Sequence, residues 1–125
     1  MSVRSLLIDD EPLVRELLVN YLKHEPDIEV VGQCANGAEA VRAVTDQRPD
    51  LMFLDVQLPD MSGFEVLSRL KVRQPEPRVL LVSATVAESD AAQALIAGAT
   101  GYLAKPFRPA QLLDAVRSSL GPSAV

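Results

Sequence analysis

Short apolar runs recur along the chain, and longer amphipathic stretches separate them. A run of about four apolar residues that stops at a polar residue or a proline is too short for a helix, and it is typical of a strand buried on both faces. The runs therefore predict five strands, at Val3–Ile8, Ile28–Val31, Leu51–Leu54, Val79–Val82 and Tyr102–Ala104.

The stretches between the runs carry apolar residues at helical spacing. Pro12 begins the first helix, where a missing N–H costs nothing, and apolar residues from Leu13 to Leu22 supply its buried face. Asn36 and Ser62 each stand three residues before a glutamate, which is the pattern of a capping box. The remaining helices are predicted at 89–97, which is rich in alanine with a shallow apolar face, and from Pro109 to Leu120.

The alternation of strands and helices predicts an α/β fold. Parallel strands need crossover connections, which are right-handed, so helices should cover both faces of a parallel sheet. At 125 residues the chain fits a single domain, which we place at residues 1–121, with a short tail at 122–125.

Composition and charge narrow the class of protein. The apolar runs are far shorter than the roughly 18 residues of a membrane span, and no signal peptide is recognisable before Asp9. The single cysteine, Cys34, cannot form an internal disulfide, which fits a cytoplasmic protein. With His24 as the only histidine, this chain alone cannot build a multi-histidine metal site or a histidine-based triad. The net charge of −5 argues against direct binding of nucleic acid.

Polar residues follow four of the five predicted strands, namely Asp9 and Asp10, Asp55, Ser83, and Lys105. In a parallel sheet these residues meet at one edge, where ligands bind in open α/β folds. The second strand ends at Gly32 instead, so we expect it to lie to one side. Taken singly, each residue has an ordinary structural role, such as an acid beside a helix N-terminus or a serine in a turn. Their joint arrival at one edge favours a functional site.

Such a cluster fits a magnesium ion and a phosphoryl group. Neighbouring carboxylates repel unless a cation lies among them, and oxygen ligands without histidine or cysteine favour Mg²⁺. Lys105, the hydroxyl of Ser83 and the backbone N–H of Ala84 would contact phosphoryl oxygens from several directions. The reaction this permits is in-line attack of Asp55 on phosphorus, which gives an aspartyl phosphate.

These positions also carry a resemblance to a known family. The matching residues are Asp9-Asp10, the segment from Asp55 through Pro59 to Gly63, Ser83-Ala84, and the segment Tyr102 to Phe107. Together they resemble the motifs of bacterial response-regulator receiver domains, and the resemblance extends from Val3 to Leu120. It implies a flavodoxin-like doubly wound sheet of five parallel strands in the order 2-1-3-4-5, an order that the periodicity alone does not give.

The resemblance further implies the role of each site residue. Asp55 would accept the phosphoryl group from the phosphohistidine of a sensor histidine kinase. Mg²⁺ would be held by Asp10, Asp55 and the backbone carbonyl of Gln57, with Asp9 contacting it through water. Ser83 and Lys105 would bind the phosphoryl group, and the Lys105-Pro106 peptide bond should be cis.

A switch is also implied by the resemblance. Phosphorylation would draw Ser83 inward and let Tyr102 move from an exposed to a buried rotamer, which would change the face formed by the alanine-rich fourth helix, the fifth strand and the last helix. We expect this face to meet an effector or a second copy of the domain. The protein would not be an enzyme towards other substrates, because it would catalyse only its own phosphorylation and dephosphorylation.

Two alternatives are weighed against this interpretation. A non-phosphorylated scaffold, or pseudo-receiver, would have the same fold with a solvated acidic pocket. A magnesium-dependent phosphatase similar to the haloacid dehalogenase class would need a second aspartate where Gln57 stands. A flavin-binding protein of this fold would need a Ser/Thr-rich phosphate loop and aromatic residues that this chain lacks.

Overall fold

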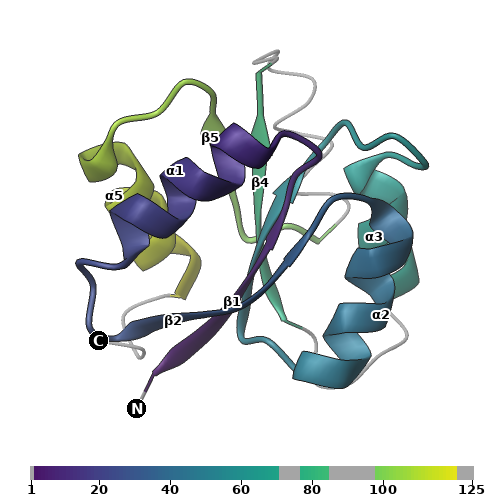
Figure 1. Cartoon of the computed structure of the whole chain (residues 1–125), viewed down its shortest axis with the longest axis horizontal. Helices are drawn as coiled ribbons and strands as arrows, with labels where there is room; N and C mark the ends of the chain where they lie inside the picture. The colour runs from purple at the N-terminus through teal and green to yellow at the C-terminus, as the bar shows by residue number, and fades with distance from the viewer. Residues whose placement is uncertain (1, 71–76, 85–97, 121–125) are drawn as a thin grey trace.

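The computed structural model describes residues 2–70, 77–84 and 98–120, and these form a sheet of parallel strands flanked by helices (Figure 1). The strands are β1 (Val3–Ile8), β2 (Ile28–Cys34), β3 (Leu51–Asp55), β4 (Arg78–Ser83) and β5 (Gly101–Ala104). The helices are α1 (Pro12–Leu22), α2 (Gly37–Gln47), α3 (Gly63–Leu70) and α5 (Pro109–Leu120). The helix predicted at 89–97 and the tail predicted at 122–125 lie outside the described residues.

The sheet confirms the predicted topology. Its order is β2-β1-β3-β4-β5, and every neighbouring pair is parallel. The register pairs Ile8 with Leu54, Asp55 with Val82, and Ser83 with Ala104. The carboxyl ends of β1, β3, β4 and β5 therefore lie along one edge, within about one residue of each other.

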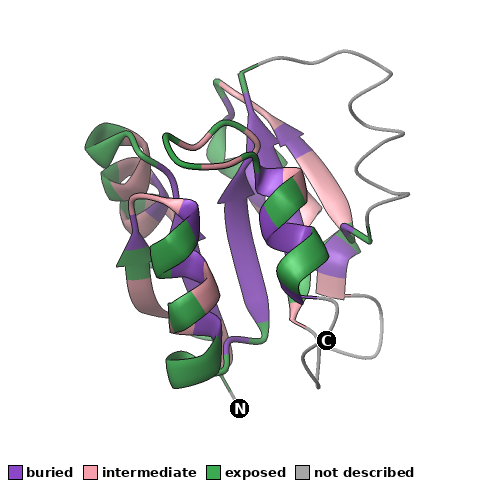
Figure 2. Cartoon of the chain, turned by 90° about the vertical axis from the view of Figure 1, so that its right-hand side faces the viewer, coloured by how far each residue is buried: buried purple, intermediate pink, exposed green. Residues whose placement is uncertain are grey.

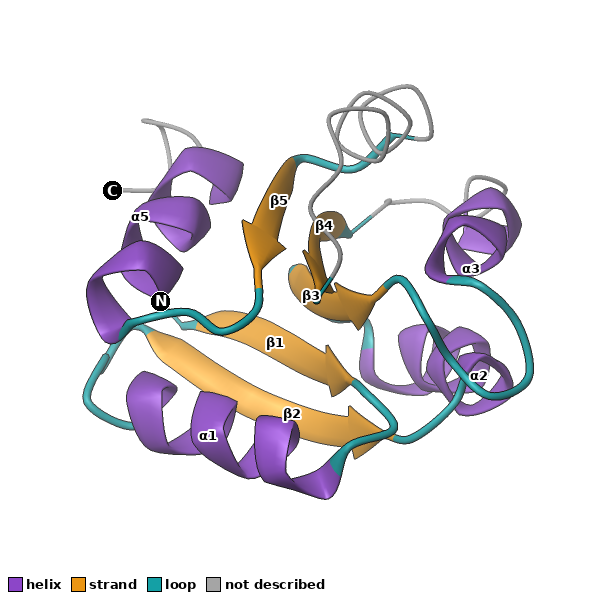
Figure 3. Ribbon diagram, turned by 90° about the horizontal axis from the view of Figure 1, so that it is seen from above, coloured by secondary structure: helices purple, strands orange, loops and turns teal. Residues whose placement is uncertain are grey.

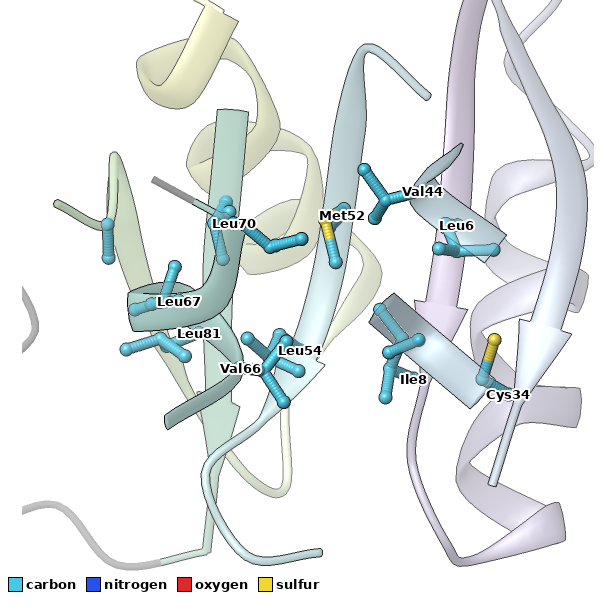
Figure 4. Close-up of a cluster of buried hydrophobic side chains, with 13 residues drawn as sticks. Leu6, Ile8, Cys34, Val44, Met52, Leu54, Val66, Leu67, Leu70 and Leu81 are labelled. Atoms are coloured by element: carbon cyan, nitrogen blue, oxygen red, sulfur yellow. The ribbon is translucent and has the colours of Figure 1, made fainter. Parts of the chain in front are cut away.

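Helices cover both faces of the sheet, with α1 and α5 on one side and α2 and α3 on the other (Figure 3). Side chains alternate across the strands, so that in β3 Met52 and Leu54 pack towards α2 and α3 while Leu51 and Phe53 pack towards α1 and α5. Figure 4 shows the core cluster on the side of α2 and α3. The central strands are buried, and the exposed residues lie mainly on the outer sides of the helices (Figure 2). Burial on both faces explains why the strands read as continuous apolar runs.

The second strand is longer than predicted. The apolar run stops at Val31, but β2 continues through Gly32 to Cys34, because the pairing with β1 resumes after a register shift between Ser5 and Leu6. A strand at the edge of a sheet keeps its ladder through polar residues as long as its single neighbour continues. The expectation that this strand lies to one side of the site is confirmed, since β2 is an edge strand of the sheet.

The predicted buried face of the first helix is wrong at Leu13, which is 78% exposed, whereas Leu18 and Leu22 are buried. Leu13 precedes Leu18 by five residues, so at 3.6 residues per turn it points well away from the side that packs on the sheet. Among the described residues no helix has both the length and the apolar character needed to cross a membrane.

The capping predictions are confirmed at the serine and asparagine side chains. Asn36 Oδ1 accepts a hydrogen bond from the N–H of Glu39 at 2.8 Å, and Ser62 Oγ accepts one from the N–H of Glu65 at 3.2 Å. The glutamates behave differently, because Glu39 reaches back to the N–H of Ala35 while Glu65 pairs with Arg69 on its own helix.

Candidate functional site

A cleft of about 230 Å³ opens at the carboxyl edge of the sheet. The residues that line it come from the last positions of β3 and β4 and from the loops after β1, β3, β4 and β5, and they are Asp10, Glu11, Asp55, Gln57, Leu58, Pro59, Ser83, Ala84 and Lys105. Asp9 is buried beside this cleft and is only 2% exposed. The structure thus brings together all the side chains that the sequence assigned to the phosphoryl and metal sites.

Lys105 is the positive centre of the site. Its Nζ donates hydrogen bonds to Asp9 Oδ2 at 2.6 Å and to Asp55 Oδ2 at 3.3 Å, and it lies 3.8 Å from Glu11 Oε1. The backbone N–H of Lys105 donates to the carbonyl oxygen of Ser83 at 2.8 Å, which fixes the start of the loop after β5. The following Lys105-Pro106 peptide bond is cis, the isomer expected from the resemblance.

Asp55 lies at the tip of β3 with its side chain almost fully buried. Burial raises the pKa of the Asp55 carboxyl from 3.8 to about 6. The hydrogen bond that Asp55 Oδ1 accepts from the N–H of Gln57, at 3.1 Å, and the nearby Lys105 oppose this shift, while the negative charge of Asp9 adds to it. The ionised form of Asp55 is therefore unfavourable in this site, and a bound cation would stabilise it.

The ammonium group of Lys105 is held in its charged form. Burial disfavours that charge, but the hydrogen bond to Asp9 and the negative charges of Asp55 and Asp9 outweigh the effect, so the pKa of Lys105 is raised. At neutral pH the lysine is a fixed positive charge beside Asp55.

The loop after β3 folds back onto the strand, and Gly63 makes this fold possible. The N–H of Gly63 donates to the carbonyl oxygen of Val56 at 2.7 Å, and Gln57 forms an isolated bridge with Ser62. A Cβ atom on Gly63 would lie only 2.5 Å from the carbonyl oxygen of Asp55, closer than side-chain carbons approach backbone. A glycine eight residues after Asp55 is thus required by the close approach of two backbone segments.

Four acidic residues face one another at the mouth of the cleft. One carboxylate oxygen from each of Asp9, Asp10, Glu11 and Asp55 lies within 4.8 Å of the others. Hard oxygen donors at this spacing fit Mg²⁺, which prefers carboxylates, carbonyls and water. The sequence reasoning did not include Glu11 among the ligands, although its place directly after the acidic pair is a visible signal.

The two acids that follow β1 differ in their surroundings. Asp9 is tied to its neighbours, because its Oδ1 accepts from the N–H of Glu11 at 2.9 Å and its own N–H donates to the carbonyl oxygen of Cys34 at 3.0 Å. Asp10 is exposed and lines the cleft. Asp10 is therefore the more accessible of the two to a bound ion, as the predicted ligand set requires.

The two residues predicted to act as a switch lie on neighbouring strands. Ser83 is buried at the end of β4 and lines the cleft, and Tyr102 on β5 is half-buried and packs against the core cluster on the side of α2 and α3. Their assignment to a switch stays a prediction.

The thiol of Cys34 is outside the lining of the cleft and is not a candidate nucleophile. Burial raises the pKa of its thiol to about 11, Glu39 adds to this effect, and Arg15 opposes it. The thiol is protonated at neutral pH and so is a poor nucleophile.

Comparison with known proteins agrees with this geometry. A family model described as the response regulator receiver domain matches residues 5–117. The chain is 42% identical over 110 residues to the transcriptional regulatory protein BtsR of Escherichia coli K12, covering 88% of this chain and 45% of BtsR. It is 34% identical over 119 residues to the response regulator protein VraR of Staphylococcus aureus Mu3, covering 95% of this chain and 57% of VraR. The chain thus spans about half the length of these curated relatives.

Solved structures show the same fold. The response regulator domain of Thermotoga maritima CheB superposes with a TM-score of 0.88 at 28% identity, covering 96% of this chain and 97% of that one. A chain of the CheX-CheY-BeF3-Mg²⁺ complex from Borrelia burgdorferi matches with a TM-score of 0.89 at 28% identity, covering 94% of this chain and 89% of that one. The chain is a member of the response regulator receiver domain family, whose members act in two-component signalling systems.

Proposed function

We propose that this domain accepts a phosphoryl group on Asp55 from the phosphohistidine of a sensor histidine kinase. The observation that carries the proposal is the buried Asp55 carboxylate at the cleft, 3.3 Å from the ammonium group of Lys105 and facing three further acids. A carboxylate in this setting is a nucleophile with positive charge already placed beside the incoming phosphoryl oxygens.

The transfer is an in-line displacement at phosphorus. An oxygen of Asp55 attacks, the P–N bond to the histidine breaks, and the imidazole nitrogen leaves with the bonding electron pair and takes up a proton. Lys105, the hydroxyl of Ser83 and the N–H of Ala84, which all line the cleft, offset the charge on the equatorial oxygens. The product is an aspartyl phosphate. Hydrolysis of this acyl phosphate later releases inorganic phosphate and returns free Asp55.

Mg²⁺ is the cofactor that the donor set fits. Asp10, Asp55 and the backbone carbonyl of Gln57 would hold it directly, and Asp9 would contact it through water. Bound there, the ion supplies positive charge that favours the ionised carboxylate and stabilises the transition state. A relative supports this proposal, because the CheY of B. burgdorferi was solved with Mg²⁺ and with BeF3, whose geometry is similar to that of a phosphoryl group.

Phosphorylation of this site would also control a binding face of the domain. Phosphorylation would draw Ser83 towards the phosphoryl group and let Tyr102 rotate inward, changing the face formed by the predicted fourth helix, β5 and α5. An effector or a second copy of the domain would bind that face. In this proposal the protein acts on no other substrate, and it is located in the cytoplasm, where it would meet the sensor histidine kinase.

Incubation with acetyl phosphate and Mg²⁺, followed by intact-mass measurement, tests the proposal. Wild-type protein should gain one phosphoryl group, and it should gain none when EDTA replaces Mg²⁺ or when the Asp55→Asn variant is used. Asp46→Asn, which removes an exposed carboxylate on α2, is the matched control and should be phosphorylated like the wild type. A wild-type protein that gains no mass would contradict the proposal and favour the pseudo-receiver instead.

A further inference from the structure

The loop between β3 and α3, residues 56–62, is fastened to a helix that follows a different strand. Both carboxylate oxygens of Asp60 accept hydrogen bonds from the first turn of α2, Oδ1 from the N–H of Gly37 at 2.7 Å and Oδ2 from the N–H of Ala38 at 2.9 Å. These N–H groups have no partner within their own helix, so a carboxylate from outside satisfies them. The two segments are more than twenty residues apart in sequence and are joined at this point.

The next residue of the loop strengthens the attachment. A Cβ atom on Gly37 would collide with the side chain of Met61, and it would lie 2.6 Å from the Met61 sulfur. Met61 therefore rests directly on the backbone of Gly37. Asp60 and Met61, which are consecutive in the loop, thus both contact the first turn of α2.

This attachment is one step in a series of contacts that joins Asp9 to Asp55. The N–H of Asp9 donates to the carbonyl oxygen of Cys34 at the end of β2, and α2 begins three residues later. From α2 the connection passes through Asp60 into the loop, and the N–H of Gln57 in that loop donates to Asp55 Oδ1 at 3.1 Å. The two buried acids are thus linked through the loop and the start of α2.

We propose that Asp60 is a positioning residue for the phosphoacceptor site, which sets the place of the Gln57 backbone above Asp55 by anchoring the loop to α2. The proposal rests on the function proposed above, since it concerns the same cleft. Gln57 contributes a backbone N–H to Asp55 and its carbonyl to the predicted magnesium site, so a shift of this loop changes both contacts.

Charge suits Asp60 to this role. The hydrogen bonds from Gly37 and Ala38 lower the pKa of the Asp60 carboxyl, and a negative charge is favourable at a helix N-terminus. An asparagine would keep only one acceptor oxygen and would place an NH₂ group against the second N–H.

The test compares Asp60→Ala with Asn36→Ala. Asn36 caps the same helix through the N–H of Glu39, and within the described part of the chain its side chain makes no hydrogen bond to the loop. Its removal should therefore weaken α2 without releasing residues 56–62. Magnesium affinity is measured by isothermal titration calorimetry, amide hydrogen exchange of residues 56–62 by mass spectrometry without metal, and stability by urea unfolding.

We expect both variants to lose stability, while only Asp60→Ala exchanges the loop amides faster and binds Mg²⁺ more weakly. The expected rise in dissociation constant is about threefold to tenfold, below the full effect of removing a group bonded directly to a metal ligand. Asp60→Asn should lie between Asp60→Ala and the wild type.

Two results would overturn the inference. One is equal magnesium affinity and loop exchange in Asp60→Ala and the wild type. The other is an equal loss in Asp60→Ala and Asn36→Ala, which would mean that Asp60 acts only by stabilising α2. Either result leaves the proposed function standing, whereas a wild-type protein that binds no Mg²⁺ would contradict that function itself.

Discussion

Replacing Asp55 with asparagine is expected to stabilise the metal-free protein at neutral pH, although it removes the proposed nucleophile. Burial places this carboxyl in a site where its charged form is unfavourable, and its pKa rises from 3.8 to about 6. At about 1.4 kcal/mol per pKa unit, the difference costs the folded state about 3 kcal/mol at a pH above the folded value.

The asparagine removes the charge but stays desolvated, and it weakens the hydrogen bond from Lys105. We therefore expect about 1–2 kcal/mol of the penalty to be recovered. For a domain of 125 residues this corresponds to a rise in melting temperature of roughly 3–10 °C.

The pH dependence has a defined sign. Because the folded pKa is higher than the unfolded one, Asp55 contributes a destabilisation that is full above about pH 6 and is relieved as the pH falls towards 3.8. Wild-type stability minus that of Asp55→Asn should therefore rise on going from about pH 7.5 to about pH 5.

Urea unfolding in EDTA, followed by circular dichroism since the chain has no tryptophan, measures this difference. Saturating Mg²⁺ should reverse the order of the two proteins, because only the wild type keeps the complete ligand set and gains binding free energy. An Asp55→Asn variant that is less stable than the wild type in EDTA at neutral pH would refute the reasoning.

Three further predictions concern the framework of the site and the core. Gly63→Ala should lower the free energy of unfolding by about 1–3 kcal/mol in urea, because its new methyl group would meet the carbonyl oxygen of Asp55, and an unchanged midpoint would contradict that close approach. Ser119→Ala should raise stability by up to about 1 kcal/mol in the same assay, since Ser119 Oγ is buried and has no hydrogen bond within the described part of the chain; a loss of stability would mean that the hydroxyl has a partner. Asp60 contributes to stability with the opposite sign to Asp55, because the pKa of the Asp60 carboxyl is lowered on folding. This stabilisation is present above the unfolded pKa and is lost as the pH falls through the folded pKa. Acid titration should show that loss in the wild type and not in Asp60→Ala.

The sequence was sufficient for the part of the site that depends on strand ends. Four of the five apolar runs stop at the sheet edge, so that Asp55 and Ser83 end their strands and Lys105 directly follows its strand. A parallel sheet brings these residues to the same edge whatever the strand order. The order 2-1-3-4-5 came from the resemblance and not from periodicity.

Contacts between loops and distant elements could not be predicted from the sequence. The anchoring of Asp60 on α2 depends on how two turns fold back towards each other, which no spacing rule describes, and an exposed loop aspartate reads as ordinary surface. The extension of β2 to Cys34 was missed for a related reason, since pairing with β1 holds its polar end in the sheet. Leu13 was misassigned because an apolar residue near a helix start was counted on the buried face although its angular position excludes it.

The most direct test of the central claim is to locate the phosphoryl group. Borohydride reduces an acyl phosphate to an alcohol, so treatment of the protein after acetyl phosphate and Mg²⁺ converts a phosphorylated aspartate to homoserine, which peptide mass spectrometry can place. The account predicts homoserine at position 55 alone. Homoserine at position 9 or 10, or at no position in protein that has gained a phosphoryl group, would contradict it.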